Sequence, residues 1–394
     1  MQPSHRSRRL IALANATLVG LTALAACAEA PPPVELDDPL PGLTPSQLAR
    51  FEEGEAIFES AFTAEQGIGP LFNAEGCALC HDDPTDAGNG ATRELHATGI
   101  GEEGTCDALF AHGGPVIQQR ATQALTDALG ITAEPVPAQA TGTGLRTTPD
   151  IFGFGLLDAI PDETIVALSD PDDRDGDGIS GRVNRLVDGR LGRFGRKAAV
   201  SNLADFNEGA FLLELGLTTP RQLAENSIAG APLPPGVDPT PEPEVSAEMV
   251  ALTTDYVRFL APPAPAKRGA LEYRGAHVFE RIGCAACHVP SLRTGPHEVA
   301  ALSRQKVGAY TDLLLHDMGP ELADVCLGAA GPAEFRTEPL MGLRHVPAFL
   351  HDGRAANVTE AIELHGGEAS AARDAFLALS KDERQGLLAF LASL

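Results

Sequence analysis

The sequence predicts a mainly α-helical protein of two domains, in which short helices are joined by long loops and sheet is scarce. The 41 glycines and 31 prolines among 394 residues disfavour long regular elements. The hexapeptides GCALCH (76–81) and GCAACH (283–288) repeat one pattern in the two halves of the chain. A chain of this length also exceeds what one hydrophobic core usually organises, so two domains are expected.

The N-terminal residues are typical of a bacterial export signal. Arg6, Arg8 and Arg9 precede the apolar run LIALANATLVGLTALAA, which Cys27 follows. Small residues stand directly before Cys27, which favours lipid attachment to this cysteine and cleavage ahead of it; an ordinary A-x-A cleavage is the alternative. Because Ala28 and not an aspartate comes next, we expect a lipid-anchored protein of the cell envelope, held at the outer membrane and facing the periplasm.

The charge and hydropathy of the chain limit the classes of partner that it is expected to bind. A formal net charge of -25 argues against nucleic acid and favours a basic protein or a small molecule. No segment after the signal is apolar enough to span a bilayer, so we expect membrane contact through the lipid anchor only.

The repeated hexapeptides carry the chemistry. A Cys-x-x-Cys pair alone suits a zinc knuckle or a redox dithiol, but a histidine directly after the second cysteine is the additional requirement of covalently attached haem c. The two cysteines form thioethers and the histidine supplies an axial nitrogen to the iron. We therefore expect two covalently bound haems c, attached at Cys77, Cys80 and His81 and at Cys284, Cys287 and His288.

The duplication extends beyond the hexapeptides. FEEGEAIFE precedes the first and YRGAHVFER the second, so each follows a predicted helix with a glycine and a phenylalanine on its packing face. A helix is also expected to begin at Ser246, and another at Ser380, which has capping-box spacing to Glu383. The last helix has an apolar stripe formed by Leu387, Leu388, Leu391 and Leu394.

These features predict two cytochrome c-like domains. The segment AGAPLPPGVDPTPEPEVS contains six prolines, which exclude a helix and suit a semi-rigid linker. The expected order is a lipoprotein signal peptide at 1–27, a linker at 28–45, an N-terminal haem domain at 46–228, the proline-rich linker at 229–245 and a C-terminal haem domain at 246–394.

Two cysteines remain after Cys27 and the haem motifs are assigned. In an oxidising periplasm, Cys106 and Cys326 are most simply paired in a disulfide, which would tie the two halves together. Two separate buried thiols are the alternative.

Several longer motifs resemble those of one protein family. The runs GPLFNAEGCALCH, FGFGLLDAIPDETI, DRDGDGISGRVN, LLLHDMGPELAD and FLHDGRAANVTEAIELHGGEA look like bacterial di-haem oxidoreductases, distant relatives of the di-haem cytochrome c peroxidases; some members are labelled thiol oxidoreductases. The resemblance runs from about residue 50 to the C-terminus. It implies that the N-terminal haem meets hydrogen peroxide and that the C-terminal haem receives electrons.

The resemblance also implies a second ligand for the C-terminal haem. In the relatives a methionine stands on the helix after the HDG run, and here His365 occupies that place in NVTEAIELH. We expect His288 and His365 to form a bis-histidine pair, which lacks the thioether that raises a haem potential. Met318 and Met341 are rival ligands, although methionine more often fills gaps in a core.

For the N-terminal haem the relatives have a labile histidine in the loop after the haem motif. His96 lies fifteen residues after His81, in an expected loop, and is the candidate. His112 is the competitor, and a solvated loop histidine is the alternative for either.

Cleaving the O–O bond of peroxide needs an acid–base group. The region that matches the relatives' catalytic glutamate is LLDAIPDETI, which makes Glu163 and Asp158 the candidates. The alternative is a helix start, because PDET places acidic residues in a first turn where the dipole favours them. We favour that alternative for Asp162.

An acidic loop predicts a calcium site. Asp173, Asp175 and Asp177, followed by Gly178, match the first half of an EF-hand loop. Asn184 stands at the twelfth position, where a bidentate glutamate is expected. A solvated acidic turn is the alternative.

The chain has no tryptophan, whereas the relatives commonly have one between the two haems. Arg196 in GRFGRKA and Met341 in PLMGL replace the aromatic residues that are usual there. Two functions therefore stay open. The first is a peroxidase-like enzyme that reduces hydrogen peroxide with electrons from a small donor protein, a cytochrome c or a cupredoxin. The second is a membrane-tethered electron-transfer cytochrome without peroxidase activity.

Overall fold

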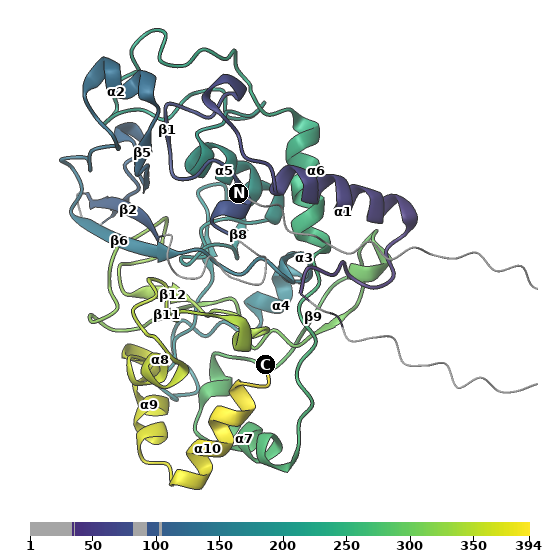
Figure 1. Ribbon diagram of the computed structural model, residues 1–394. Coiled ribbons are helices and arrows are strands. Elements are labelled where there is room, and N and C mark those ends of the chain that lie inside the picture. Colours follow the sequence, from purple (N-terminus) through teal and green to yellow (C-terminus); the bar gives the residue numbers. More distant parts are fainter. Residues whose placement is uncertain (1–33, 35, 82–92, 102–104) are drawn as a thin grey trace, which may run out of the picture. The chain divides into compact units, whose positions relative to one another are not determined.

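The computed structural model describes residues 34, 36–81, 93–101 and 105–394. Cys27 and the predicted signal peptide lie outside the described residues. Residues 34–394 form one compact unit, and both borders of the predicted proline-rich linker fall within it. The unit is helix-rich with several small sheets (Figure 1).

The helices are mostly short, as the glycine and proline content predicts. They are α1 (Pro45–Phe58), α2 (Gln123–Leu129), α3 (Phe154–Asp158), α4 (Asp162–Val166), α5 (Leu203–Leu215), α6 (Ala247–Phe259), α7 (Ala270–Arg281), α8 (Val358–Glu363), α9 (Ser370–Leu377) and α10 (Lys381–Leu391). Within the described ranges, no helix combines the length and apolar character needed to cross a bilayer.

The strands pair in antiparallel fashion. The described residues contain more strands than the sequence predicted. They are β1 (Leu71–Phe72), β2 (Arg93–Ile100), β3 (Cys106–Asp107), β4 (Val116–Ile117), β5 (Arg120–Ala121), β6 (Gly142–Thr147), β7 (Asn184–Arg185), β8 (Leu191–Gly192), β9 (Leu292–Arg293), β10 (Lys306–Val307), β11 (Leu315–Asp317) and β12 (Glu334–Arg336). In the largest sheet β2 pairs with β3, β4 and β6, and His96 lies opposite Gly144. The expected loop at His96 is therefore a strand.

The two halves use the same helix crossing. α1 meets α6 at Gly54, where an added Cβ would clash with the carbonyl oxygen of Leu252. α7 meets α10 at Gly275, where an added Cβ would clash with the carbonyl oxygen of Gly386. Only glycine allows the backbones to approach so closely, which explains why a glycine precedes each haem motif on the packing face of its helix.

A phenylalanine one turn further along each helix completes the likeness. The ring of Phe58 lies 5.0 Å from that of Tyr256 on α6, and the ring of Phe279 lies 5.4 Å from that of Phe390 on α10. These aromatic pairs close the apolar space behind each haem motif. The structure thus repeats the duplication seen in the sequence.

The main core joins the two halves. It includes Phe51 and Ile160 from the first half and Val257, Leu292 and Leu302 from the second. The proline-rich segment has neither helix nor strand but is anchored to the body, because its Val237 packs with Leu71 and Leu125.

The predicted helix starts at the two C-terminal serines are confirmed. The hydroxyl of Ser246 accepts the Met249 N–H at 3.2 Å at the start of α6. Ser380 and Glu383 form the capping box of α10. Of the apolar stripe, Leu387, Leu391 and Leu394 are buried and Leu388 is half-buried.

Cys106 on β3 and Cys326 are joined in a disulfide, with their Cα atoms 5.8 Å apart. Cys326 is buried beside Thr98 of β2, whose hydroxyl accepts the Cys326 N–H at 3.3 Å. The bond ties the largest sheet to the segment before β12.

Candidate haem-binding sites

The second haem motif opens onto a cavity. α7 ends at Arg281, and Cys284–Ala286 form a 3₁₀ turn that presents the two cysteines and the histidine. A cavity of about 470 Å³ lies in front of them. Its apolar wall is formed by residues that include Phe279, Leu340, Leu343, Val358, Phe376 and Leu387. A mostly apolar cavity of this size suits a large planar ligand.

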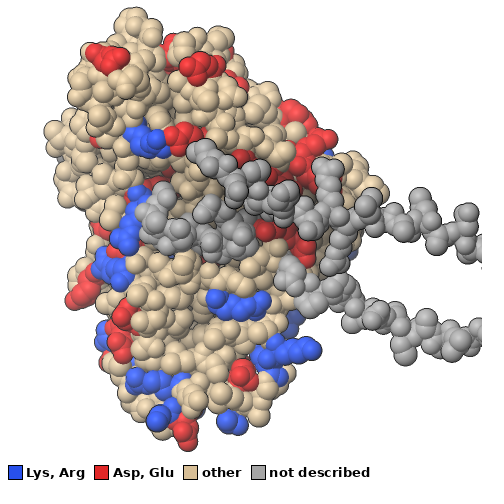
Figure 2. Space-filling view, viewed as in Figure 1, with Lys and Arg blue, Asp and Glu red and all other residues tan. Residues whose placement is uncertain are grey.

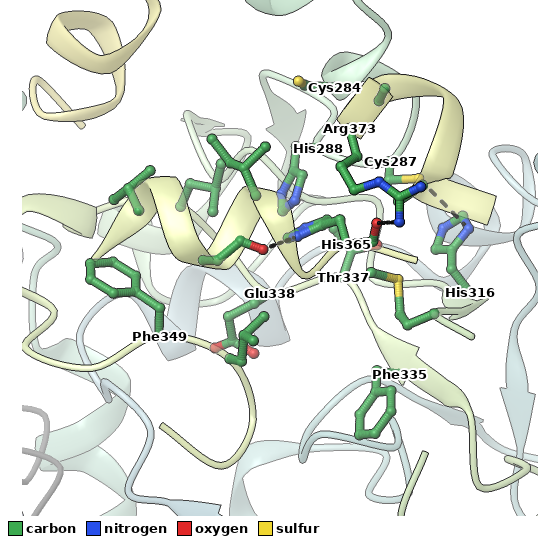
Figure 3. Close-up of a pocket in the computed structure, with 18 of the residues that line it drawn as sticks. Cys284, Cys287, His288, His316, Phe335, Thr337, Glu338, Phe349, His365 and Arg373 are labelled. Carbon is green, nitrogen blue, oxygen red and sulfur yellow. Dashed lines mark hydrogen bonds between the residues drawn. The ribbon is translucent and has the colours of Figure 1, made fainter. Parts of the chain in front are cut away.

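His288 and His365 lie next to each other in this cavity (Figure 3). The Nδ1 of His288 donates to the carbonyl oxygen of Tyr310 at 3.0 Å, and the Nδ1 of His365 donates to that of Ala361 at 2.6 Å. A carbonyl only accepts, so Nδ1 carries the proton in both rings and Nε2 is free as a lone-pair donor. Metal-binding histidines usually make this bond to a carbonyl with their other nitrogen.

Both rings are also uncharged at neutral pH. Burial lowers the pKa of His288 to about 4, with a smaller contribution from His365. Burial likewise lowers the pKa of His365. A neutral imidazole is the form that binds iron. The two histidines therefore meet the chemical requirements of a ligand pair.

The position of His365 differs in one respect from the expectation. The expected helix is present as α8, capped by Asn357, but it ends at Glu363, so His365 lies in the turn beyond it. The turn still delivers the ring to the cavity.

The structure distinguishes between the two methionines that are rival candidates for the ligand position of His365. Met318 lines the cavity with His288 and His365. Met341 packs against the main core, and its side chain lies close to Gly153. Only Met318 of the two is in reach of a group bound in this cavity.

The first haem motif has the same local structure. Cys77–Leu79 form a 3₁₀ turn, and the ring of His81 lies 5.7 Å from that of Phe58, as His288 lies 6.5 Å from Phe279. Burial lowers the pKa of His81 to about 4. A hydrogen bond to the backbone of Pro149 opposes this shift, and its acceptor is a carbonyl because proline has no N–H.

Burial raises the pKa of Cys77 and Cys80 to about 12 and that of Cys284 to about 11. Redox dithiols have a thiol of depressed pKa, so the dithiol alternative is poorly matched at the first motif, where both thiols have raised pKa values. The cysteines, a neutral histidine and an apolar cavity fit haem c better.

His96 is half-buried on β2, and its Nε2 lies 3.1 Å from Oε2 of Glu94. The charge of Glu94 acts on His81, whose pKa it raises, and on Cys80. Glu214 on α5 acts on Cys80 as well, and its carboxylate accepts a hydrogen bond from Asn73 at 2.8 Å. No sequence motif marks either acidic residue, and only the place of Glu94, two residues before His96, hints at one of them.

The predicted acid–base residues lie at helix ends. Asp158 is the last residue of α3 and accepts the Leu203 N–H at the start of α5 at 3.1 Å; burial raises its pKa. Glu163 is exposed in the first turn of α4, next to Asp162, which pairs with Arg193. Neither Asp158 nor Glu163 lines the cavity at His288.

The acidic loop brings three carboxylates together. Oxygens of Asp173, Asp175 and Asp177 lie within 4.8 Å of one another, and Gly178 has the positive φ that this loop position requires. Asn184 is buried, and its amide donates to the carbonyl of Lys197 at 2.8 Å. The twelfth position thus points into the body of the protein.

The segment 147–150 lies between the two motifs. Its Pro149 carbonyl holds His81, while its other residues line the cavity that contains His288. Arg196 also lines this cavity and pairs with Glu338 at 2.7 Å. The arginine that replaces the relatives' aromatic residue is therefore placed beside the C-terminal site.

Comparisons with known proteins agree with these assignments in part. A family model described as "Di-haem oxidoreductase, putative peroxidase" matches residues 138–394, which contain the second haem motif but not the first. A search of curated proteins found no match.

Three solved structures show weak similarity. The diheme peroxidase BthA of Burkholderia thailandensis has a TM-score of 0.44 and 15% identity, covering 89% of this chain and 86% of that one. A MauG-like protein associated with microbial copper homeostasis has a TM-score of 0.40 and 16% identity, covering 92% of each chain. Hydrazine synthase of Kuenenia stuttgartiensis has a TM-score of 0.38 and 15% identity, covering 97% of this chain and 100% of that one.

These likenesses are too low to carry an argument, and the assignment rests on the family model, which spans more than half of the chain. The chain belongs to the di-haem oxidoreductase family.

Proposed function

We propose that this oxidoreductase is a lipid-anchored, periplasm-facing di-haem c protein that reduces hydrogen peroxide with electrons from a small redox protein. The observation that carries the proposal is the pair of unlike histidine sites. His288 and His365 supply two neutral imidazoles to one cavity, whereas His81 has its own motif elsewhere. Such a difference suits one site for electron entry and another for peroxide.

The bound haems supply the one-electron redox chemistry. His288 and His365 would both hold the C-terminal haem as ligands, and two histidine ligands would leave no iron position for peroxide there. At the N-terminal site His81 is one ligand, and His96 is the proposed labile second one. We place peroxide reduction at this site.

The acid–base step belongs to a carboxylate near His81. Glu94 is better placed for it than the sequence candidates Glu163 and Asp158, because its charge acts on His81 whereas those two residues lie at helix ends. A carboxylate in this position takes a proton from the near oxygen of peroxide and returns it to the leaving oxygen.

The surface charge supports a basic electron donor. Figure 2 shows acidic side chains gathered over the part of the molecule that α1 and α6 occupy. α1 alone has Glu52, Glu53 and Glu55 within about one turn, and the whole chain has a net charge of -25. Such a surface steers a cationic cytochrome c or cupredoxin to the protein.

A second candidate is an electron-transfer cytochrome without peroxidase activity. The absence of tryptophan favours it, since the relatives' usual aromatic group between the haems is missing. Two permanently filled iron positions at both sites would mark a carrier, and an open or labile position at the N-terminal site would mark the enzyme.

One experiment tests the proposal. A pyridine haemochrome spectrum of the purified protein should show two haems c, and the oxidised or half-reduced spectrum should contain a high-spin component. Hydrogen peroxide should then oxidise the reduced protein rapidly. A protein without haem refutes the proposal, and two low-spin haems that peroxide leaves reduced favour the carrier.

Calcium is a further part of the proposal. The loop of Asp173, Asp175 and Asp177 offers oxygen ligands for a weak site suited to periplasmic calcium. Isothermal titration of chelator-treated protein should detect binding that Asp175→Ala abolishes, because alanine supplies no ligand oxygen, and no heat of binding in the wild-type protein would refute the site.

A further inference from the structure

A buried charge cluster forms part of the wall of the C-terminal cavity and has no part in the proposed ligation. His316 on β11 is 3% exposed. Its Nε2 lies 2.9 Å from Oδ2 of Asp312, and its Nδ1 lies 2.7 Å from Oε2 of Glu368. An ionised carboxylate only accepts hydrogen bonds, so both ring nitrogens carry protons and His316 is an imidazolium.

The surroundings hold this ring in one position. The Glu368 carboxylate also accepts the Ser180 hydroxyl at 2.8 Å and the N–H groups of Ser180 at 3.1 Å and Asp317 at 3.2 Å. On the other side, an added Cβ at Gly181 would lie 2.6 Å from Cε1 of His316. The backbone therefore packs directly on the imidazolium, which leaves the ring no room to turn.

The charge stands beside the covalent attachment of the C-terminal haem. The Nδ1 of His316 lies 3.7 Å from Sγ of Cys287, the contact drawn in Figure 3. Burial alone lowers the pKa of His316, but its hydrogen bonds with Asp312 and Glu368, which remain when Cys287 is bonded to haem, raise it. The two carboxylates on either side of the ring therefore favour its charged form.

We propose that His316 sets the reduction potential of the C-terminal haem by holding a fixed positive charge next to Cys287. The inference rests on the proposed function, since it needs a haem attached at Cys284 and Cys287. Ferrous iron has one positive charge fewer than ferric iron, so a nearby cation favours the reduced form and a nearby carboxylate the oxidised form. His316 does not touch the iron and acts as a positioning residue.

Substitution of the histidine and substitution of a carboxylate in this cluster should shift the potential of the C-terminal haem in opposite directions. With Asp312 and Glu368 ionised and His316 protonated, the three side chains have one net negative charge. His316→Gln leaves two negative charges and should lower the midpoint potential of the C-terminal haem. Glu368→Gln leaves none and should raise it.

The experiment is a spectroelectrochemical titration of the full-length holoprotein. The C-terminal haem is identified as the one whose potential changes in His365→Met. His277→Gln and Glu298→Gln, at exposed positions, are the matched controls and should leave both potentials at their wild-type values. Shifts of opposite sign in His316→Gln and Glu368→Gln support the inference.

A merely structural role gives a different result. Loosening the cavity wall would admit solvent in both variants and shift both potentials in the same direction. Equal signs, or no shift in either variant, overturn the inference. If His316→Gln loses haem, Glu368→Gln decides alone, since only a raised potential is consistent. A wild-type protein without two haems c overturns the proposed function itself.

Discussion

His288 and His365 present their unprotonated Nε2 atoms to the same cavity because each Nδ1 is held by a backbone carbonyl, of Tyr310 and Ala361. This tautomer is enforced by the chain before any group binds. The two rings thus have the tautomer that ligation through Nε2 requires.

The first prediction follows from this pair. His365→Met should raise the potential of the C-terminal haem, because a thioether ligand favours ferrous iron, and should create a methionine-to-iron charge-transfer band. His365→Gly should leave one iron open without detaching either haem. Unchanged spin states and potentials in His365→Gly would mean that another residue, with Met318 first, is the ligand.

The second prediction concerns the acid–base group. Glu94→Gln should lower kcat/KM for hydrogen peroxide by about 10²-fold, the usual contribution of a positioned acid–base group, with haem content unchanged. Glu163→Gln removes an exposed first-turn carboxylate and should leave the rate unchanged. Steady-state assays with a reduced cytochrome c measure kcat/KM for both variants. A loss of activity in Glu163→Gln but not in Glu94→Gln would make Glu163 the acid–base residue.

The third prediction tests the helix crossings. Gly275→Ala forces the Cβ into the carbonyl oxygen of Gly386 and should destabilise the protein by roughly 1–3 kcal/mol. Gly209 on α5 has no atom within 4 Å of an added Cβ, so Gly209→Ala should stabilise the helix by about 0.5–1 kcal/mol. Urea denaturation measures both, and equal effects would contradict the close crossing.

The fourth prediction is a pH dependence of stability. Carboxylate oxygens of Glu225, Asp238, Glu242 and Glu244 lie within 4.8 Å of one another. Burial, together with repulsion from the other three, raises the pKa of Glu225 from 4.5 to about 9. The folded state then binds a proton that the unfolded state releases above pH 4.5, so this contribution to stability is present at low pH and is lost as pH rises towards 9.

The loss is at most about 1.4 kcal/mol per pH unit for one proton. Glu225→Gln should flatten the fall in the free energy of unfolding between pH 5 and pH 9. Glu298→Gln, at an exposed position, should keep the wild-type slope. A wild-type slope in Glu225→Gln would show that this carboxyl has an ordinary pKa.

The fifth prediction concerns the anchor. Cys27→Ser should release a soluble protein into the periplasmic fraction, because a single lipidated cysteine is the expected tether. Fractionation followed by immunoblotting measures this. Full membrane association of the variant would require another attachment.

The sequence predicted features that depend on near neighbours. Ser380 and Glu383 are three residues apart, so their capping box can be recognised from spacing alone. The glycine on each crossing helix was recognised in the same way. His96 was misplaced in a loop because its strand depends on pairing with β6, more than forty residues away, which no local pattern reveals.

The candidate site, like the fold, was predicted only where short sequence motifs mark its residues. The haem-attachment residues and His365 lie in such motifs, but Glu214 and His316 are brought to their sites by the tertiary fold. Asp158 looked like a candidate for acid–base chemistry because it lies in LLDAIPDETI, the segment that matches the region of the relatives' catalytic glutamate. Its bond to the Leu203 N–H is a long-range contact that the sequence does not encode locally.

The Cys106–Cys326 disulfide has a consequence for how the protein is made. Its cysteines are 220 residues apart, so the bond cannot form until both distant segments of the chain are available. The cysteines of each haem motif are three positions apart and meet as soon as they emerge. We expect the periplasm to keep those four thiols reduced until haem is attached, and to oxidise Cys106 and Cys326 only after the sheet and the segment before β12 have come together. Maturation therefore has an order, imposed by distance along the chain.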